Sequence, residues 1–211
     1  MAYSKYKNIQ LVVQKFGTKA IPSDLFKGLI VEIQPSDWLL TTLNYMSSHG
    51  FDTEKERSER LISPILTEFL VKNQNQITLY SGHELNVKRA EDLNGECDYL
   101  LTLGNKVPDY VDKPIFSIVE AKRQDFELGT GQCAAQMLGA KLYNDADGVS
   151  TSFIYGAATD GVKWRFLKFE NNTFFIDSKY YVTENLPELL GVLQYIFEDC
   201  KKNLLSNAIN K

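Results

Sequence analysis

The middle of the chain shows the pattern of apolar and polar positions that predicts β-strands. Three runs carry it: 77–87, 95–103 and 115–122. The third run has apolar residues at both odd and even positions, so it is expected to be a central strand with both faces buried. The loop 104–113 is rich in Gly, Asn, Pro and Asp and leaves no room for a crossover helix. The two strands on either side of it should therefore form an antiparallel hairpin.

Apolar residues at helical spacing lie on both sides of this region. One helix is predicted over 54–72 and a strongly amphipathic one over 186–205, whose apolar stripe we interpret as part of the core. Pro64 interrupts the first helix, which either kinks there or starts again with Ser63 as its cap. A further helix is expected to open at the Gly-Thr-Gly stretch 129–131.

Shorter strands and turns complete the pattern. Strands are predicted at 153–158, 164–169 and 173–176, separated by tight turns at Asp160-Gly161 and Asn171-Asn172. Residues 1–50 lack such regularity and should form an irregular, partly helical N-terminal extension, in which Ser36 caps a short helix. The sequence thus predicts a single domain over residues 1–211 with its core at 54–180. The fold class is α/β, with helices that flank a mixed β-sheet.

Composition and charge narrow the functional classes. The net charge of −4 and the predicted pI of about 5.3 weigh against a large electrostatic footprint on DNA. They do not exclude a nuclease, because a divalent-metal site itself contributes carboxylates. The three cysteines have no C-x-x-C spacing, so no zinc site is expected. No apolar run approaches the ~20 residues that span a bilayer, and we expect a soluble, cytoplasmic protein without a membrane partner.

The tripeptide Glu120-Ala121-Lys122 is the strongest chemical signal in the sequence. Residues i and i+2 of a strand project from the same face, and here the two charged residues end a strongly apolar strand. Charges in such a place are costly unless they pair with each other or coordinate a metal. Taken alone, the tripeptide is explained as well by a buried or half-exposed ion pair.

Asp98 changes this balance. A hairpin that is symmetric about its loop places Asp98 opposite Glu120, with Cα atoms roughly 4.5–5.5 Å apart. Two carboxylates this close repel each other unless a cation lies between them, and Mg²⁺ or Mn²⁺ suits such hard oxygen ligands. The metal would polarise a phosphodiester and activate a water. Lys122 would hold that water or offset the charge of the transition state.

Four segments in this order resemble the PD-(D/E)XK nuclease superfamily, in particular the nuclease domain of type I restriction enzyme R subunits. They are a helix with an acid (Glu59-Arg-Leu-Ile-Ser-Pro-Ile-Leu66), a strand with an Asp (Gly95-Glu-Cys-Asp98-Tyr-Leu-Leu), a strand with Glu-x-Lys (Ile118-Val-Glu120-Ala-Lys122-Arg) and a helix with Gln (Gly131-Gln132-Cys-Ala-Ala-Gln136). The resemblance covers roughly residues 55–170. Cys97 stands where the superfamily's motif has a Pro, a position that varies widely.

The resemblance implies a restriction-endonuclease-like fold and a role for each matching residue. Asp98, Glu120 and the backbone carbonyl of Ala121 would be metal ligands. Lys122 would be the catalytic lysine. Glu59 would be an accessory acid that supports the metal or the water, with a solvated helix face as its alternative.

The remaining candidates are less closely defined. Gln132 or Gln136 would face the site from its helix, and the sequence leaves open which one does, since they lie one turn apart. Both are equally well explained as ordinary helix residues. Lys88, Arg89 and Arg123 either contact a phosphate backbone or serve as solubilising charges.

The sequence therefore favours a Mg²⁺- or Mn²⁺-dependent endonuclease that hydrolyses phosphodiester bonds of DNA, with RNA a less favoured substrate. A homodimer is expected if duplex DNA is cut, because a double-strand break needs two sites. One alternative is an inactive nuclease-like module that binds nucleic acid or protein, which the acidic balance favours and the intact Asp98, Glu120 and Lys122 set disfavours. Another is an α/β domain with a fortuitous ion pair.

Overall fold

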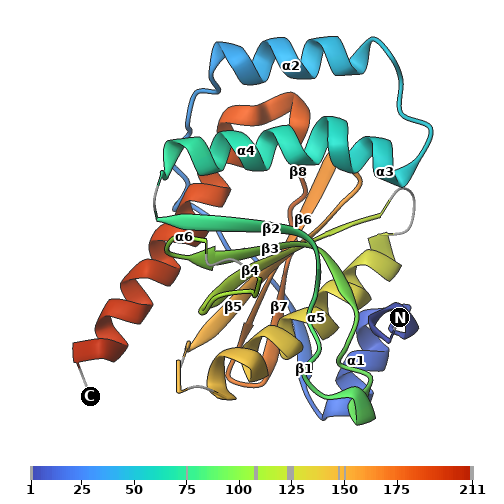
Figure 1. Cartoon of the computed structure of the whole chain (residues 1–211), viewed down its shortest axis with the longest axis vertical. Coiled ribbons are helices and arrows are strands. Elements are labelled where there is room, and N and C mark those ends of the chain that lie inside the picture. The colour runs from blue at the N-terminus through green and yellow to red at the C-terminus, as the bar shows by residue number, and fades with distance from the viewer. Residues whose placement is uncertain are drawn as a thin grey trace.

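The fold is built on one eight-stranded mixed sheet (Figure 1), with strands in the order β1-β7-β6-β5-β4-β3-β2 and the short β8 beside β6. The computed structural model describes residues 2–74, 76–106, 109–122, 126–146, 148–149 and 151–209, with side chains as far as Leu204. The strands are β1 (Lys19–Ser23), β2 (Ile77–Glu84), β3 (Glu96–Leu103), β4 (Ile115–Ala121), β5 (Phe153–Thr159), β6 (Lys163–Glu170), β7 (Thr173–Asp177) and β8 (Tyr181–Val182). The predicted fold class, a mixed sheet flanked by helices, is confirmed at this level.

Strand directions bring the ends of several strands to one edge of the sheet. β3 and β4 form an antiparallel hairpin, β4 and β5 run parallel, β5, β6 and β7 are successively antiparallel, and β1 is parallel to β7. Consequently β4, β5, β7 and β1 end at the edge at which β3 and β6 begin. We call this the β4-end edge.

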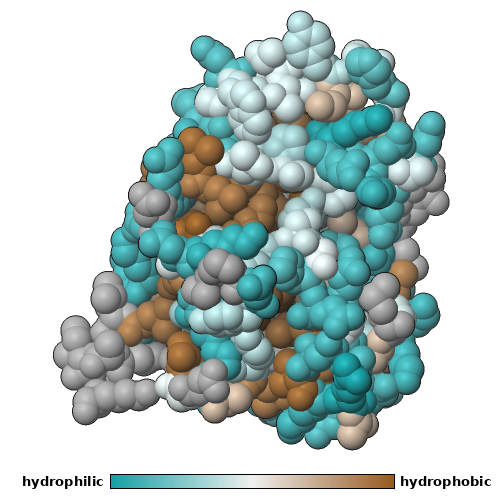
Figure 2. All heavy atoms as spheres, viewed as in Figure 1, coloured by the Kyte–Doolittle hydropathy of each residue, from teal (hydrophilic) through white to brown (hydrophobic). Residues whose placement is uncertain are grey.

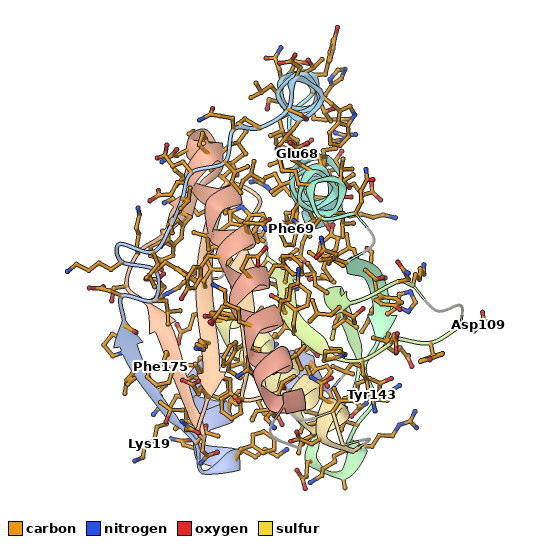
Figure 3. The ribbon with its side chains drawn as sticks, turned by 90° about the vertical axis from the view of Figure 1, so that its left-hand side faces the viewer. Lys19, Glu68, Phe69, Asp109, Tyr143 and Phe175 are labelled. Atoms are coloured by element: carbon orange, nitrogen blue, oxygen red, sulfur yellow. The ribbon has the colours of Figure 1, made fainter. Side chains whose placement is uncertain are left out.

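Helices cover both faces of the sheet (Figure 1). α5 (Phe126–Ala146) connects β4 to β5 and packs with α1 (Ile9–Phe16) on one face, while α4 (Ser63–Lys72) and α6 (Leu186–Ile209) cover the other. α2 (Asp37–Ser47) lies over α4, away from the sheet (Figure 3). The short helical segments are Tyr3–Lys5, α3 (Glu54–Arg57), Ser58–Ile62, Arg89–Glu91 and Thr183–Asn185.

Each face of the sheet buries its own apolar cluster, one beneath α4 and α6 and the other beneath α5 and α1. On the face of the molecule that Figure 2 shows, hydrophilic side chains predominate, and apolar side chains are visible between α4 and the sheet. Among the helices of the described ranges, none has the length and hydropathy that a membrane crossing requires.

Most predicted elements are present with similar bounds. The three central runs form β2, β3 and β4, and every residue of β4 is buried, as expected for a central strand. Asn171 and Asn172 both have positive φ (47° and 59°), which a tight hairpin turn of this kind requires. The carboxylate of Asp160 accepts hydrogen bonds within the turn before β6. The stripe of the helix predicted over 186–205 packs into the core, as expected.

The N-terminal 50 residues are partly helical, as predicted, but they also contribute a strand and so are not an extension outside the sheet. β1 joins the sheet at its edge beside β7, and α1 packs on α5. The pattern missed β1 because the strand is short and only partly buried, and because it contains Pro22, which strands tolerate at a sheet edge. The helix expected after Ser36 is present, and the Ser36 hydroxyl accepts the N–H of Leu39 at 3.2 Å.

The helix predicted over 54–72 is present without a restart at Pro64. α3 continues into a π-helical turn and then into α4. Ser63 keeps a right-handed helical backbone, and its N–H bonds to the carbonyl of Ser58. Ser63 is therefore not a cap. Pro64 lacks an N–H and would crowd the preceding turn of a regular α-helix. The wider π-turn before Pro64 allows the helix to continue through this position.

The helix predicted to open at the Gly-Thr-Gly stretch 129–131 begins earlier. α5 starts at Phe126, so this stretch lies inside the helix. Gly131 allows another segment of the chain to approach α5 closely, because a Cβ at this position would lie 2.5 Å from the carbonyl oxygen of Tyr6. The N-terminal segment thus crosses α5 in a backbone contact that only glycine permits.

A buried carboxylate joins α2 to α4. Glu68 is 2% exposed and accepts the N–H of Ser36 at 2.8 Å and its hydroxyl at 2.7 Å, with Lys72 at 3.4 Å. Burial alone would raise the pKa of Glu68, but the hydrogen bonds from Ser36 and the charge of Lys72 outweigh it and lower the pKa. Figure 3 places Glu68 between the two helices and Phe69 towards the core.

Glu68→Ala should lower the free energy of unfolding by about 1–3 kcal/mol, because the donors of Ser36 lose their buried acceptor. A lowered carboxyl pKa contributes stability above the ordinary Glu range, and that contribution is lost as pH falls. The deficit of the variant should therefore shrink on acidification. Urea unfolding at several pH values measures it, with the exposed Glu32→Ala as control. Equal stability of Glu68→Ala and wild type near neutral pH would contradict this assignment.

Candidate active site

Glu120 is the buried centre of a polar group at the β4-end edge. It is the second-last residue of β4 and is 2% exposed. Gln136 of α5 donates through Nε2 to Oε2 of Glu120 at 2.7 Å, and the ammonium of Lys122 lies 3.1 Å from Oε1. Both carboxylate oxygens therefore have a donor, one from the helix and one from the strand exit.

Lys122 places its ammonium among three oxygen atoms. Besides Oε1 of Glu120, Nζ lies 3.0 Å from Oε1 of Glu54 and 2.9 Å from the carbonyl oxygen of Ala121. Carboxylate and carbonyl oxygens are also the donors that hard divalent cations prefer. Oxygen donors at this point thus converge on a cation, and in this structure that cation is the ammonium.

Asp98 lies on the neighbouring strand of the hairpin. The register pairs Tyr99 with Val119, and one residue further it places Asp98 opposite Glu120. Oδ2 of Asp98 accepts the N–H of Ala121 at 2.7 Å. The Asp98 carboxylate therefore lies against the backbone at the end of β4, next to the carbonyl that receives the lysine.

The electrostatics of these groups are coupled. Burial raises the pKa of Glu120 to about 8, and the charge of Asp98 adds to this shift against the opposing effects of Lys122 and Gln136. Burial also raises the pKa of Asp98, although Lys122 and the N–H of Ala121 oppose it. Burial would lower the pKa of Lys122, but Glu120 and Asp98 outweigh it and raise that pKa. One firmly charged lysine thus sits with two carboxyls that resist ionisation, a combination found often at catalytic sites.

A cleft of about 400 Å³ opens beside Asp98, between the helical segment that starts at Glu54, the end of β2 and the start of β3. Its acidic lining residues are Glu54, Glu59, Glu96 and Asp98. On its wall the hydroxyls of Ser58 and Tyr99 lie 2.6 Å apart. Such a lining attracts cations and repels anions.

Glu59, the predicted accessory acid, lines the cleft but does not contact the lysine. Its side chain is 62% exposed and pairs with Lys55 at 3.8 Å. The helical acid that contacts Lys122 is Glu54, for which the sequence predicted no role. The sequence does signal the helix start, because Thr53 and Glu56 form a capping box, but it does not show which acid turns inward.

Gln136 is the glutamine that contacts Glu120. Gln132 is also buried, one turn nearer the start of α5. Oε1 of Gln136 is buried without a hydrogen-bond partner among the described residues, so Glu120 is what orients this amide. Of the basic candidates, Lys88 pairs with Glu91, and Arg123 lies outside the described residues.

The donor set can be compared with the needs of a metal ion. Among the described residues, no three His, Cys, Asp or Glu side chains gather closely enough to hold one. The available donors are the carboxylates of Asp98 and Glu120 and the carbonyl of Ala121. This set fits Mg²⁺, which typically binds through one or two carboxylates and keeps several waters.

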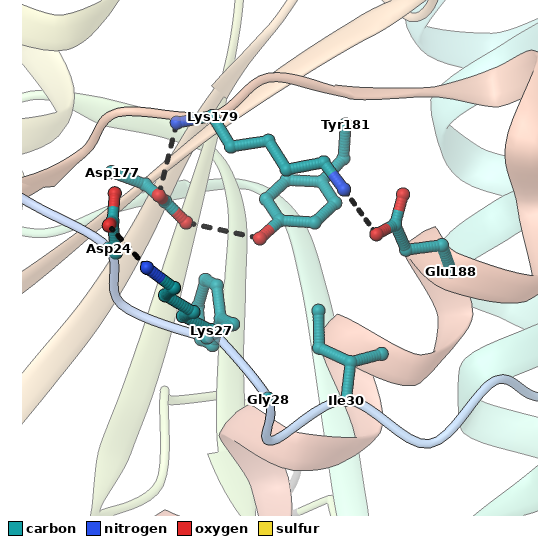
Figure 4. Close-up of a pocket in the computed structure, with 9 residues that line it drawn as sticks. Asp24, Lys27, Gly28, Ile30, Asp177, Lys179, Tyr181 and Glu188 are labelled. Atoms are coloured by element: carbon teal, nitrogen blue, oxygen red, sulfur yellow. Dashed lines mark hydrogen bonds and ion pairs between the residues drawn. The ribbon is translucent and has the colours of Figure 1, made fainter.

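A second pocket, of about 430 Å³, lies at the same edge beside β7 (Figure 4). Asp177 is 1% exposed and accepts the N–H of Lys179 at 3.1 Å and the hydroxyl of Tyr181 at 3.3 Å. Lys179 in turn pairs with Glu188. The polar groups of this pocket satisfy one another and fasten β8 to the end of β7, which makes it a weaker candidate site than the cleft.

Glu120→Gln should stabilise the fold when divalent ions are absent. The folded state raises the pKa of Glu120 to about 8, so ionising it costs free energy in the folded protein that the unfolded chain does not incur. The gain in melting temperature should be near zero at about pH 4 and grow from about pH 5 to pH 8. Thermal unfolding in EDTA measures it, with Glu32→Gln as control. A gain that stays constant with pH, or a loss, would contradict the assignment.

Comparisons with known proteins give no match from which a function could be assigned. No protein-family model matches the chain. No curated protein matches it in a sequence search either. The function has to be argued from the residues at the β4-end edge.

Proposed function

We propose that this protein is a metal-dependent nuclease of the PD-(D/E)XK type, with a restriction-endonuclease-like fold, that hydrolyses phosphodiester bonds of DNA. The observation that carries the proposal is the convergence of Glu120, Glu54 and the Ala121 carbonyl on the ammonium of Lys122, with Asp98 beside them. A structural ion pair needs neither a third oxygen donor nor a second, half-buried carboxylate beside it.

The arrangement of elements supports the same proposal. The hairpin β3–β4 carries Asp98 and Glu120, α5 returns the chain from the lysine to β5, and the helical segment with Glu54 faces the end of the hairpin. The order of acid-bearing helix, Asp strand, Glu-x-Lys strand and Gln helix is the one in which the sequence resembles that superfamily. The resemblance of the motifs and the layout of the sheet are thus consistent.

Asp98, Glu120 and the Ala121 carbonyl would hold Mg²⁺ or Mn²⁺, which supplies Lewis-acid polarisation of the phosphodiester and a bound water of lowered pKa. Gln136 orients the Glu120 carboxylate through its hydrogen bond. Because the carboxyls of Glu120 and Asp98 have raised pKa values, a divalent cation would have to displace protons to bind, and binding should strengthen with pH.

Lys122 is the group of this chain that would contact the substrate. Its raised pKa keeps it protonated near neutral pH, so its role is that of a charge and a hydrogen-bond donor rather than a base. The ammonium would donate to a phosphate oxygen or to the attacking water and offset the negative charge that develops there. Glu54 would help to position the ammonium, which lies 3.0 Å from its Oε1.

The second candidate function is a nuclease-like module that binds nucleic acid or protein without cutting. Two observations favour it: the described residues contain no group of three metal-binding side chains, and Lys122 already neutralises Glu120.

A protein that cuts duplex DNA should also be a homodimer, since one domain supplies one site.

Glu120→Ala should abolish cleavage and weaken metal binding, because it removes a carboxylate ligand. Lys122→Ala should also abolish cleavage or slow it by about two or more orders of magnitude, but should leave metal binding intact or tighter because a nearby positive charge is lost. The assays are cleavage of plasmid, linear and single-stranded DNA with Mg²⁺ or Mn²⁺, and metal titration calorimetry.

Both variants should stay folded, which thermal unfolding checks. If the wild type binds DNA yet cuts none of these substrates with either metal, the binding-module function is correct. If Lys122→Ala cuts as fast as the wild type, the assigned role of the lysine is wrong even for an active nuclease.

The two helix acids provide a further test. Glu54→Ala should slow cleavage by about tenfold or more, because the ammonium of Lys122 loses the carboxylate that positions it. Glu59→Ala should cut at close to the wild-type rate, because its carboxylate is exposed and pairs only weakly. Single-turnover rates at saturating Mg²⁺ compare the two, and the reverse order of effects would show that Glu59 is the functional acid.

A further inference from the structure

Arg165 shares a sheet face with the proposed catalytic carboxylate. The register pairs Glu120 with Ala158 of β5, and Ala158 with Arg165 of β6. Directly opposed residues project to the same face, so Glu120, Ala158 and Arg165 form a row across three strands. Two strand spacings put the Cα atoms of Arg165 and Glu120 about 10 Å apart.

Arg165 forms a stack with aromatic side chains at the β4-end edge. Nη1 donates to the hydroxyl of Tyr180 at 3.0 Å, and the guanidinium carbon lies 5.1 Å from the centre of the Tyr180 ring. The ring of Phe126, the first residue of α5, meets Tyr180 edge to face with centroids 5.7 Å apart. We call Arg165, Tyr180 and Phe126 the Arg165 platform.

The platform is partly exposed: Arg165 and Phe126 are half-buried, and Nε of Arg165 is buried without a hydrogen-bond partner among the described residues. Tyr180 is 42% exposed although two partners hold its ring in place. Within the described part of the chain, no carboxylate pairs with Arg165, whereas Lys122 and Lys179 at the same edge are both paired. Lys163, two residues earlier in β6, has the same strand parity as Arg165 and is exposed. An unpaired cation is notable in a chain with a net charge of −4.

We propose that the Arg165 platform binds one unpaired nucleotide of the substrate, with its base stacked on Tyr180 and its phosphate on Arg165. The inference rests on the proposed nuclease function and names its substrate class: single-stranded DNA, or a frayed or flapped end. Aromatic rings hold bases of any identity by stacking, but only when the base is free of a duplex partner. The planar guanidinium suits a phosphate because it offers several donors in one plane.

α5 covers the row between the two charged ends: Ala158 is 1% exposed, and a Cβ at Gly129 of α5 would lie 3.4 Å from the Cβ of Ala158. A ligand therefore reaches the platform from the β4-end edge and not over Ala158. An acidic peptide would also be attracted by Arg165 and Lys163, but it gains nothing from the exposed face of Tyr180.

The test is binding of a fluorescent 12-nucleotide single strand and of its duplex by anisotropy, in EDTA so that no cleavage occurs. The wild type should bind the single strand more tightly than the duplex. Tyr180→Ala and Arg165→Ala should each weaken single-strand binding by about tenfold, whereas Tyr180→Phe keeps the ring and most of the affinity. Controls at the opposite edge are Tyr110→Ala for an exposed ring and Lys19→Ala for an exposed charge.

The outcomes separate this inference from the proposed function. If Tyr180→Ala and Arg165→Ala bind the single strand as the wild type does, the platform assignment is wrong while metal-dependent cutting can still be observed and still depend on Glu120. Poly-glutamate that displaces the oligonucleotide as well as unlabelled DNA does would also overturn it, because charge alone would then explain binding. A wild type that neither binds nor cuts any nucleic acid overturns both.

Discussion

The burial of the Glu120 carboxylate at the end of a central strand is the constraint on which the site depends. A carboxylate that is 2% exposed and lies close to Asp98 is unfavourable unless donors surround it. Gln136 and Lys122 provide those donors from α5 and from the strand exit. The fold therefore spends stability at this point, which natural proteins do chiefly where function requires it.

The β4-end edge combines two kinds of surface that one anionic substrate would need. On the side of β2 and β3 the cleft is acidic and suits a divalent cation. Across the sheet on the side of β6, Arg165 and Tyr180 form a cationic and aromatic surface without a paired carboxylate among the described residues. In the proposed function, the acidic cleft would hold the divalent cation and Arg165 would hold the anionic substrate.

The sequence by itself determined the centre of this site. The apolar run of β4 and the short loop before it predicted an antiparallel hairpin symmetric about that loop, and a pleated strand fixes which residues share a face. Asp98 and Glu120 could therefore be placed opposite each other before the structure was known. Local chemistry also specified the Ser36 cap and the Asn171-Asn172 turn, because each depends only on neighbouring residues.

Only the tertiary structure decided which helical residues face the site. The acids of the first helix lie within two turns, and the choice of Glu54 over Glu59 depends on how the helix docks against the sheet. The same holds for Gln136 over Gln132 as the partner of Glu120. β1 was not recognised because its pairing with β7 is long-range, and a strand that is short and partly exposed carries no alternation of its own. Contacts between distant segments are set by packing of the whole chain, which local patterns do not contain.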